Sequence, residues 1–555
     1  MKNLVARRSF VTGAAVAGAA MAAGTAATGG AMAGAKARAA EAATESGALR
    51  VVSEDGIAWD KTADFVCVGS GTAVYGALGA TEAGCSAIVI EERGVVGGTT
   101  RLSGCCVWVP ENEHQVESYG ADLPAEEVLG YLKAVDIYSG ASDEAKADYV
   151  ANAASFFAWT EQNWGFDQAV YEVLGDYQDC AGCKAMGRSL IHVDKEGVFL
   201  NGEDFFSQKV EPLLEERGVE VLLETRVTGL VRATDGKVVG VLAEGADGQL
   251  AVKAEKGVLL GTGGFDRNPA MRARYLRGPV FGSNSVETCT GDGIVLGMKA
   301  GANLANMGSV WQLPFYVTGD EEDLSLTTDW FEYGGLPGSL TVNATGRRFC
   351  DENTAYGAAD LAFYAYDTHT FQFRNLPAYQ ICDAEHVSYY GWPAYSAEQP
   401  AWFKEYATLD ELADACGIDP TGLAEEVAHF NAMAETGVDE DFHRGEGNYG
   451  PINVAGYMVE RPELKNPCMA PVATPPFYVA QVAPGCCGGT SGGLEVDLDA
   501  RVLDLDGNPI PGLYACGNTS ASPFGSAYPG AGGTDGAGFY RAFRAANHAC
   551  ELGMF

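Results

Sequence analysis

A short apolar strand that runs into a glycine turn and a small-residue helix is the feature that most restricts the fold. Residues 62–68 read Thr-Ala-Asp-Phe-Val-Cys-Val and lead directly into Gly69-Ser-Gly71. An Ala- and Gly-rich helix is expected to about Gly84, and residues 87–90 form a second apolar strand that ends at Glu91. In such a unit the helix N-terminus offers unpaired N–H groups to a pyrophosphate, and the acid accepts ribose hydroxyls. The pattern predicts a dinucleotide-binding α/β fold.

Val74 stands where a third glycine is usual, which weakens this fingerprint because it predicts looser helix-to-strand packing. Later segments strengthen it by following in the order that a flavin requires. Residues 97–104 form a second glycine-rich loop, residues 221–227 and 237–242 are expected strands, and residues 256–265 enter another glycine turn. We therefore expect bound FAD. The expected FAD-binding residues are Gly69, Ser70, Gly71, Thr72, Ala73, Glu91, Glu92, Gly97, Gly98, Thr99, Thr100, Ser103, Gly104, Val227, Gly263, Gly264, Asp292, Gly517 and Asn518.

The composition changes between about residues 276 and 469 toward aromatic residues and mixed helix, with apolar residues at helical spacing from Asp410 to Glu435. We interpret this stretch as an inserted α+β catalytic or cap domain. The Rossmann-like FAD-binding domain would then be discontinuous, spanning residues 41–275 and 470–555 of the 555. In such an architecture the ligand is expected in the cleft between the lobes.

Charge and the N-terminal segment bear on location and partners. The net charge of −38 and pI near 4.4 argue against nucleic acid as a partner, because nucleic acids attract basic surfaces. Residues 1–40 carry Arg7-Arg8, Phe10 and an Ala- and Gly-rich run, which indicate a twin-arginine export signal. We expect an extracytoplasmic protein, associated with the outer side of the cytoplasmic membrane through a partner.

The chain has fifteen cysteines, which is a large and odd number. Their spacing is not that of a disulfide scaffold. The close pairs leave two hypotheses open: ligands of a [4Fe-4S] cluster, or small buried hydrophobic and redox thiols. The six candidate ligands are Cys105, Cys106, Cys180, Cys183, Cys486 and Cys487.

These motifs together resemble the flavoprotein family that contains soluble fumarate reductases and 3-ketosteroid dehydrogenases. The resemblance covers nearly all of the chain after residue 40. It rests on the glycine turn at Gly69, Gly-Gly-Thr-Thr at 97–100 leading to Trp108-Val-Pro, residues 290–293 and 343–352, and the segment around Gly517.

Two departures separate this chain from the fumarate-type members of that family. Those members resemble one another in gripping carboxylates with two arginines, and the matching positions here are Tyr356 and Tyr528. Arginine is permanently charged and binds carboxylate bidentately, whereas a phenol donates one hydrogen bond to a neutral carbonyl and presents an apolar flank. The resemblance to the steroid-dehydrogenase branch therefore implies a neutral, hydrophobic, carbonyl-conjugated substrate. The alternative is that either tyrosine is a core aromatic.

The resemblance also implies roles for individual residues. Tyr528 and Gly532 would polarise the substrate carbonyl, and Tyr356 would be the proton donor or base. Tyr333 and Trp108 are expected to line the substrate pocket.

Arg347 and Arg348 could feed protons or simply pair with Asp351 and Glu352. We expect a reductase that takes electrons from a separate membrane-bound or cytochrome donor, since no haem-attachment motif is present and an exported enzyme cannot draw on cytoplasmic nicotinamide. Its substrate would be a steroid-like enone or an unsaturated lactone such as that of a cardiac glycoside. The alternatives are oxidative 3-ketosteroid dehydrogenation, and a fumarate-reductase-like respiratory reductase or flavin electron carrier.

Overall fold

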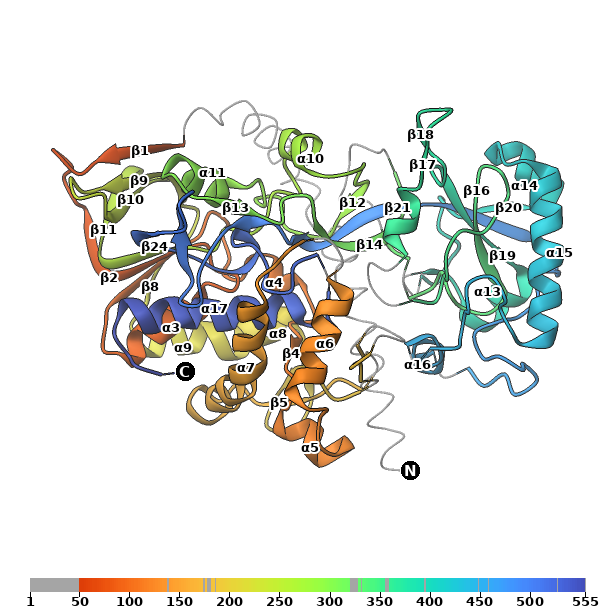
Figure 1. The fold of residues 1–555 in the computed structure, drawn as a ribbon, viewed down its shortest axis with the longest axis horizontal. Helices are drawn as coiled ribbons and strands as arrows, with labels where there is room; N and C mark the ends of the chain where they lie inside the picture. Colours follow the sequence, from red (N-terminus) through yellow and green to blue (C-terminus); the bar gives the residue numbers. More distant parts are fainter. Residues whose placement is uncertain are drawn as a thin grey trace.

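The computed structural model divides into two lobes (Figure 1). It describes residues 49–136, 139–172, 175–176, 181–184, 186–319, 328–330, 332–354, 359–393, 396–447, 449–457, 459–526 and 528–554. The expected export signal, residues 1–40, lies outside the described residues.

The first lobe is built on a nine-stranded sheet. Its main path runs β1-β9-β10-β11-β2-β3-β8, and β24 pairs with both β11 and β23. These strands are β1 (Arg50–Ser53), β2 (Lys61–Val68), β3 (Ala87–Ile90), β8 (Glu220–Leu222), β9 (Arg226–Arg232), β10 (Val238–Gly245), β11 (Gly248–Leu260), β23 (Arg501–Leu503) and β24 (Pro509–Ala515).

Five of these strands, β24, β11, β2, β3 and β8, run parallel to one another. Residues 65–68 and 87–90 are all buried, because one face of this part of the sheet packs on helices and the other on a cluster that includes residues of β9 and β10. The carboxyl ends of the five strands meet at one edge. Residues from both ends of the chain therefore form one dinucleotide-binding sheet, which agrees with the discontinuous α/β domain predicted from the sequence.

Helices α3 (Val74–Glu82) and α17 (Gly533–Ala549) pack closely together beneath this sheet (Figure 1). A Cβ on Gly76 would lie 2.6 Å from Leu259 of β11, and a Cβ on Gly79 would lie 3.0 Å from Phe543 of α17. Two glycines inside α3 therefore give the close helix packing that Val74 had been expected to loosen.

A mostly helical layer, residues 107–216, covers α3 and α17. It contains a four-stranded sheet of order β4-β6-β5, with β7 paired to β6. Its elements are β4 (Val107–Trp108), α5 (Glu113–Tyr119), α6 (Ala125–Val135), α7 (Asp143–Trp164), β5 (Gln168–Val170), β6 (Ser189–Val193), β7 (Phe199–Leu200), α8 (Gly202–Phe205), the π-helix η1 (Phe206–Val210) and α9 (Glu211–Glu216).

The second lobe contains a seven-stranded sheet of order β15-β14-β21-β19-β16, with β12 and β20 also paired to β21. Its strands are β12 (Gly282–Ser283), β14 (Val310–Tyr316), β15 (Thr328–Asp329), β16 (Ser339–Asn343), β19 (Ala378–Asp383), β20 (Lys404–Tyr406) and β21 (Phe477–Thr490), with a separate hairpin of β17 (Tyr366–Asp367) and β18 (Gln372–Phe373). Its helices are α12 (Asp360–Phe363), α13 (Ala384–Tyr390), α14 (Leu409–Cys416), α15 (Pro420–Thr436) and α16 (Tyr449–Gly456).

The strand pairing moves both domain boundaries. β21 belongs to the second sheet, so the chain returns to the first lobe at about residue 490 and not at 470. Residues 292–305 still pack on the first lobe, so its first segment extends well past residue 275. Figure 1 shows β21 extending from the second lobe to the first.

Short elements join the lobes and complete the first one. They are α4 (Gly98–Leu102), α10 (Pro269–Tyr275), α11 (Asp292–Lys299), β13 (Leu304–Ala305), β22 (Gly493–Leu494) and the 3-10 helix η4 (Gly517–Thr519). None of the helices within the described ranges is long and apolar enough to span a bilayer.

Two sequence expectations need correction. The strand expected over residues 221–227 is divided between β8 and β9, because the chain turns at Glu224, which has a φ of 50°. The helical stretch from Asp410 to Glu435 forms two helices, which separate at Gly417 with a φ of 68°.

Candidate active site

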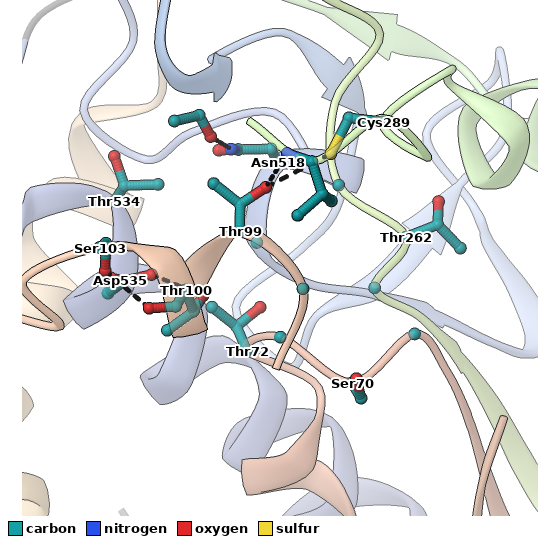
Figure 2. A pocket seen from close by; sticks show the side chains of 18 of the residues that line it. Ser70, Thr72, Thr99, Thr100, Ser103, Thr262, Cys289, Asn518, Thr534 and Asp535 are labelled. Carbon is teal, nitrogen blue, oxygen red and sulfur yellow. Dashed lines mark hydrogen bonds between the residues drawn. The ribbon is translucent and has the colours of Figure 1, made fainter. Parts of the chain in front are cut away.

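A pocket opens at the edge where the parallel strands end. Residues at the ends of β2, β3, β11 and β24 line it together with residues of α4, β9, α11 and the N-terminus of α17. Figure 2 shows side chains of the pocket, with Ser70 and Asp535 on opposite sides of Thr100. The carboxyl edge of a parallel sheet is where α/β proteins bind nucleotide cofactors.

Glycine lets two strands meet beneath the pocket. Gly69 has a φ of 94°, and a Cβ there would lie 2.2 Å from the Gly261 oxygen. No other residue type fits both the backbone conformation and the space. The turn into α3 therefore exposes its backbone to the pocket, as a pyrophosphate site requires.

Glu91 at the end of β3 holds two glycine loops together. Its carboxylate accepts hydrogen bonds from the Ser70 backbone nitrogen (3.1 Å), from the Ser70 hydroxyl and from the Arg93 nitrogen (2.8 Å). The Ser70 Oγ in turn accepts from the Gly97 nitrogen at 2.8 Å. Glu91 lines the pocket and also fixes the geometry of the loops beside it.

A second acid group lies on the same side of the pocket. Arg226 of β9 contacts Asp292 of α11 at 2.7 Å and Glu92 at 3.8 Å. Burial by the pocket walls raises the pKa of Glu92 to about 7, against the lowering effect of Arg226. Among the described lining residues Arg226 is the one basic side chain.

The N-terminus of α17 carries a carboxylate at the other side of the pocket. Thr100 of α4 donates to one oxygen of Asp535 at 3.0 Å, and Ser103 donates to the other at 3.2 Å. Burial raises the pKa of Asp535 to about 6, against the lowering effect of the two hydroxyls. Figure 2 shows these contacts.

Tyr528 lines the pocket just before α17. Its phenol oxygen accepts a hydrogen bond from the Gly532 nitrogen at 3.2 Å, and its ring packs edge-on against Trp311 with centroids 5.4 Å apart. Burial raises the pKa of Tyr528 well above its ordinary value. The phenol therefore keeps its proton at neutral pH and can donate it in a hydrogen bond.

Gly532 brings α17 against the loop that follows α4. It has a φ of 93°, and a Cβ there would lie 2.4 Å from the backbone of Cys106 and Val107. Tyr528 and Gly532, both predicted as site residues, therefore lie together at one end of the pocket.

Three of the cysteines named as cluster ligands line the pocket: Cys105, Cys106 and Cys487. Cys105 adopts a φ of 50°, which is unfavourable for a residue with a Cβ. Cys486 is buried beside the pocket, and Cys183 packs against the core of the first lobe. Within the described residues no three His, Cys, Asp or Glu side chains converge to hold a metal ion, so the iron–sulfur hypothesis has no support. Cys180 lies outside the described residues.

Most of the predicted FAD-binding residues line the pocket. The three that do not are Ala73, Gly97 and Gly264. Each supports a neighbour: the methyl of Ala73 packs against Gly261, and a Cβ on Gly97 or Gly264 would collide with Arg101 or Thr490.

The prediction for Trp108 was wrong. Its side chain is fully buried in the first-lobe core, stacked on Tyr149 with centroids 6.4 Å apart, and its Nε1 donates to Asp176 at 2.7 Å. Gly530 covers the indole, because a Cβ there would lie 2.6 Å from it. Trp108 supports the loop that carries Tyr528 from behind.

The prediction for Tyr333 was also wrong. Its ring is buried in the core of the second lobe against His386, and its hydroxyl donates to the Gly391 oxygen at 2.7 Å. The neighbouring Glu332 lines the pocket instead. Tyr356 lies outside the described residues, so its role stays a prediction.

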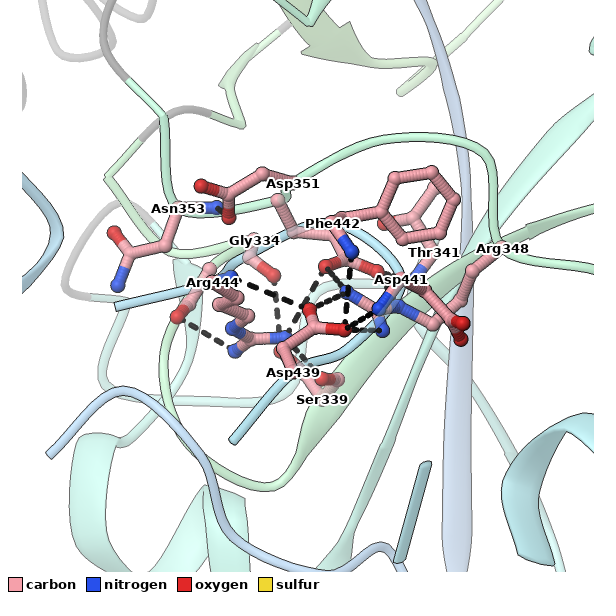
Figure 3. A network of polar contacts seen from close by, with 12 residues as sticks. Gly334, Ser339, Thr341, Arg348, Asp351, Asn353, Asp439, Asp441, Phe442 and Arg444 are labelled. Carbon is pink, nitrogen blue, oxygen red and sulfur yellow. Dashed lines mark hydrogen bonds and ion pairs between the residues drawn. The ribbon is translucent and has the colours of Figure 1, made fainter. Parts of the chain in front are cut away.

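A buried ion network supports the second lobe (Figure 3). Arg348 contacts Glu352 at 2.7 Å and Asp439 at 2.9 Å, and Arg444 contacts Glu352 at 3.3 Å. The expected pairing of Arg348 with Glu352 is therefore present. Arg347 pairs with Glu425 instead, on the surface.

Several lining residues were not predicted from the sequence. Arg226, Asn284 and Glu332 had no motif that marked them, and Tyr171 lies in a segment read only as part of the first domain. Asp535 did carry a signal, because it is the one acidic residue in the glycine-rich segment 525–538.

The pocket residues fit FAD. The glycine cradle and the α3 N-terminus suit the pyrophosphate, the acids after β3 suit the ribose, and the N-terminus of α17 offers unpaired backbone N–H groups at the opposite end. Both ends of an elongated dinucleotide thus meet complementary groups.

Comparisons with known proteins agree with this fit. The chain is 30% identical over 532 residues to 4-oxocyclohexanecarboxylate 2-dehydrogenase of Sinomonas cyclohexanicum, covering 86% of this chain and 90% of the relative. It is 26% identical over 530 residues to digoxin reductase of Eggerthella lenta, covering 86% and 85%. The structure of 3-ketosteroid delta1-dehydrogenase from Sterolibacterium denitrificans matches with a TM-score of 0.78 and 28% identity, covering 89% of this chain and 100% of that one.

A protein-family match covers both lobes. Residues 64–534 match the family described as FAD binding domain, which includes both lobes and the pocket. The relatives are a dehydrogenase and a reductase. The chain therefore belongs to the FAD binding domain family and is an FAD-dependent oxidoreductase acting on CH–CH groups.

Proposed function

We propose that this protein reduces a C=C bond conjugated to a carbonyl in a neutral, steroid-like substrate, such as an enone or an unsaturated lactone. The observation that carries the proposal is Tyr528, a protonated phenol in the pocket at a position where fumarate-type relatives resemble one another in having arginine. A phenol suits a neutral carbonyl oxygen, whereas a dicarboxylate needs fixed positive charge.

The charges of the pocket support a neutral substrate. Its described lining holds five acids, Glu91, Glu92, Asp292, Glu332 and Asp535, and one basic residue, which is paired with Asp292. Glu332 and Asp535 lie on the side away from that basic residue, toward the second lobe and α17. An anionic substrate would meet repulsion there, because like charges in a poorly solvated site repel strongly.

The residues around Tyr528 suit carbonyl polarisation. The Gly532 nitrogen donates to the phenol oxygen, and the protonated phenol can itself donate one hydrogen bond to a carbonyl oxygen. Negative charge that develops on the substrate oxygen would be stabilised by this hydrogen and by the backbone at the start of α17. When bound, FAD supplies reversible hydride transfer.

The proton for the substrate carbon needs a second group. Tyr356 is the proposed donor, on the basis of its place after Arg348 and Glu352 in the sequence. The buried ion network around Glu352 supports this proposal indirectly, because it fixes the segment that leads to Tyr356.

We propose the reductive direction because of the twin-arginine pattern in residues 1–40, which would place the enzyme outside the cytoplasmic membrane. Electrons would then come from a separate membrane-bound or cytochrome donor. The oxidative direction is the second candidate. Its support is that 4-oxocyclohexanecarboxylate 2-dehydrogenase and 3-ketosteroid delta1-dehydrogenase, two of the matching proteins, are dehydrogenases.

The experiment is anaerobic reoxidation of the dithionite-reduced enzyme. A steroid enone, an unsaturated steroid lactone and fumarate are mixed separately with the reduced enzyme, and flavin absorbance is followed. We expect reoxidation by the enone or the lactone and none by fumarate. Reoxidation by fumarate alone would contradict the proposal. Reduction of the oxidised enzyme by a saturated ketosteroid, with no reoxidation by any enone, would favour the oxidative candidate.

A further inference from the structure

Asp535 is a partly buried carboxylate in the pocket with no cationic partner among the described residues. Its described hydrogen-bond donors are the Thr100 and Ser103 hydroxyls at 3.0 and 3.2 Å, and no ion pair involves it. Elsewhere in the interior, carboxylates such as Glu352 and Asp176 have buried arginines beside them. A carboxylate that keeps only neutral donors is costly to hold ionised, which makes its charge sensitive to other charges nearby.

The titratable groups that face Asp535 among the described residues are all neutral. Tyr75 of α3, Cys105 and Cys106 of the loop after α4, and Tyr528 before α17 are close enough for its charge to affect them. Burial raises the pKa of each of these four groups, so none is charged near neutral pH. Asp535 is therefore the one group of this cluster that can change charge between pH 5 and 8.

A purely structural role for Asp535 is the competing interpretation. An acid in the first turn of a helix commonly stabilises the helix dipole. Here, however, the N-cap Gly532 makes no side-chain cap, and the described bonds of the Asp535 oxygens go to Thr100 of α4 and to Ser103 just after it, not to backbone nitrogens of α17. The carboxylate is directed to the pocket side of the helix, where it lines the cavity.

We propose that Asp535 couples flavin reduction to uptake of a proton by the protein and lowers the reduction potential of the bound FAD. Reduction of bound FAD by two electrons and one proton would add one negative charge to the pocket. Asp535 would take a second proton from solvent and cancel that charge. On loss of a hydride to an acceptor, Asp535 would return its proton to solvent, so charge and atoms would balance over the cycle.

The physical basis is electrostatic. A carboxylate beside the flavin opposes the charge that reduction adds, which makes reduction less favourable while Asp535 is ionised. Burial already raises the pKa of Asp535 to about 6, so the additional charge raises it further, into the neutral range. The inference needs only that FAD binds in this pocket, and it does not depend on which substrate is used.

The test is spectroelectrochemical titration of the FAD-loaded enzyme from pH 5.5 to 8.5, with no substrate present. Wild type is compared with Asp535→Asn and with Asp506→Asn, which removes the same charge from an exposed turn. For each proton taken up with two electrons, the reduction potential falls by about 30 mV when the pH rises by one unit, which is a tenfold change in proton concentration. We expect the Asp535→Asn potential to lie above that of wild type and its slope to be smaller by about one proton.

Equal slopes in wild type and Asp535→Asn, or a shift no larger than that of Asp506→Asn, would overturn the proposal. If Asp535→Asn does not retain FAD, Thr100→Val decides the question, because it keeps the carboxylate and removes one of its two hydrogen bonds. That variant is expected to move the region of steeper slope to higher pH. An unchanged curve in a Thr100→Val enzyme that binds FAD would equally overturn the proposal.

Discussion

Two carboxylates, the fully buried Glu352 in the second lobe and the partly buried Asp535 in the pocket, show how differently this protein uses the same group. Glu352 is fully buried between Arg348 and Arg444 and also accepts from the Thr341 nitrogen at 2.9 Å. These partners outweigh the cost of burial and hold the pKa of Glu352 below its usual value. Asp535 has two hydroxyls and no arginine, and burial raises its pKa to about 6.

The charge of Glu352 stabilises the fold, whereas the charge of Asp535 can change with the charge of a bound cofactor. The Glu352 network ties together β16 and residues 335–336 through carbonyls that Arg444 also contacts. Its charge is needed at every working pH. Asp535 lies where a cofactor's charge can reach it, and its two protonation states are close in free energy near pH 6.

The largest expected effect comes from breaking the structural network. Glu352→Gln leaves Arg348 and Arg444 buried with too little negative charge, so the free energy of unfolding should fall by about 3–5 kcal/mol. Urea unfolding followed by tryptophan fluorescence measures this. Glu425→Gln, which removes the surface partner of Arg347, is the control and should cost less than about 1 kcal/mol. Equal losses of unfolding free energy in the two variants would contradict the distinction between the buried ion network and a surface ion pair.

Tyr528→Phe should change catalysis more than stability. Loss of the phenol hydrogen removes one donor to the substrate oxygen, and kcat should fall about 10²–10³-fold. FAD content should stay near that of wild type, since the ring still packs on Trp311. Steady-state kinetics with a steroid enone and the flavin-to-protein absorbance ratio measure the two effects. Tyr366→Phe, in the exposed β17–β18 hairpin, serves as the control, and a similar loss there would contradict the assignment.

The smallest effect is the pH dependence of apoprotein stability. The folded pKa of Asp535, about 6, exceeds the unfolded value of about 3.9. Between these values the folded chain binds more protons than the unfolded chain, so ionised Asp535 lowers stability as pH rises from about 4 to about 6. Asp535→Asn should therefore be more stable than wild type at pH 8, by about 1–3 kcal/mol, and equal to it near pH 4.

The pH dependence of stability that Glu352 contributes has the opposite sign. Its folded pKa is lowered, so the stability that its ionised form contributes is present above the unfolded pKa and is lost as pH falls. Thermal melts of the Asp535→Asn and wild-type apoproteins across pH 4–8 measure the effect of Asp535 ionisation on stability. An Asp535→Asn apoprotein that is less stable than wild type at pH 8, with a deficit that shrinks toward pH 4, would show that Asp535 is a structural charge like Glu352.

The first lobe could be predicted from sequence because its loops are constrained by backbone geometry. Gly69 and Gly532 must be glycine, so the glycine pattern locates the turns directly. The domain boundary could not be read in this way. β21 contains Gly485 and Gly488, which look like a loop, but a Cβ on Gly485 would collide with the ring of Phe315 on the neighbouring strand. Its strand conformation is a consequence of tertiary packing.

The site was predictable in part for the same reason. Tyr528 was found because it lies inside a glycine motif that must approach the cofactor. Trp108 and Tyr333 lie beside comparable motifs but face the two cores, and the choice of face depends on Asp176 and His386, which are distant in sequence. The role of Asp535 could not be predicted from the sequence, because hydroxyls contact its carboxylate only when α4 packs on α17.

The most direct test of the proposed function varies substrate charge alone. The reduced enzyme is mixed anaerobically with 4-oxocyclohex-2-ene-1-carboxylate and, separately, with its methyl ester, which differ by one negative charge, and the second-order rate constant of flavin reoxidation is measured. Because the acids of the pocket outnumber its one basic residue, we predict that the ester reacts at least about tenfold faster, equivalent to about 1.4 kcal/mol. A faster reaction with the free carboxylate would contradict the assignment of a neutral substrate.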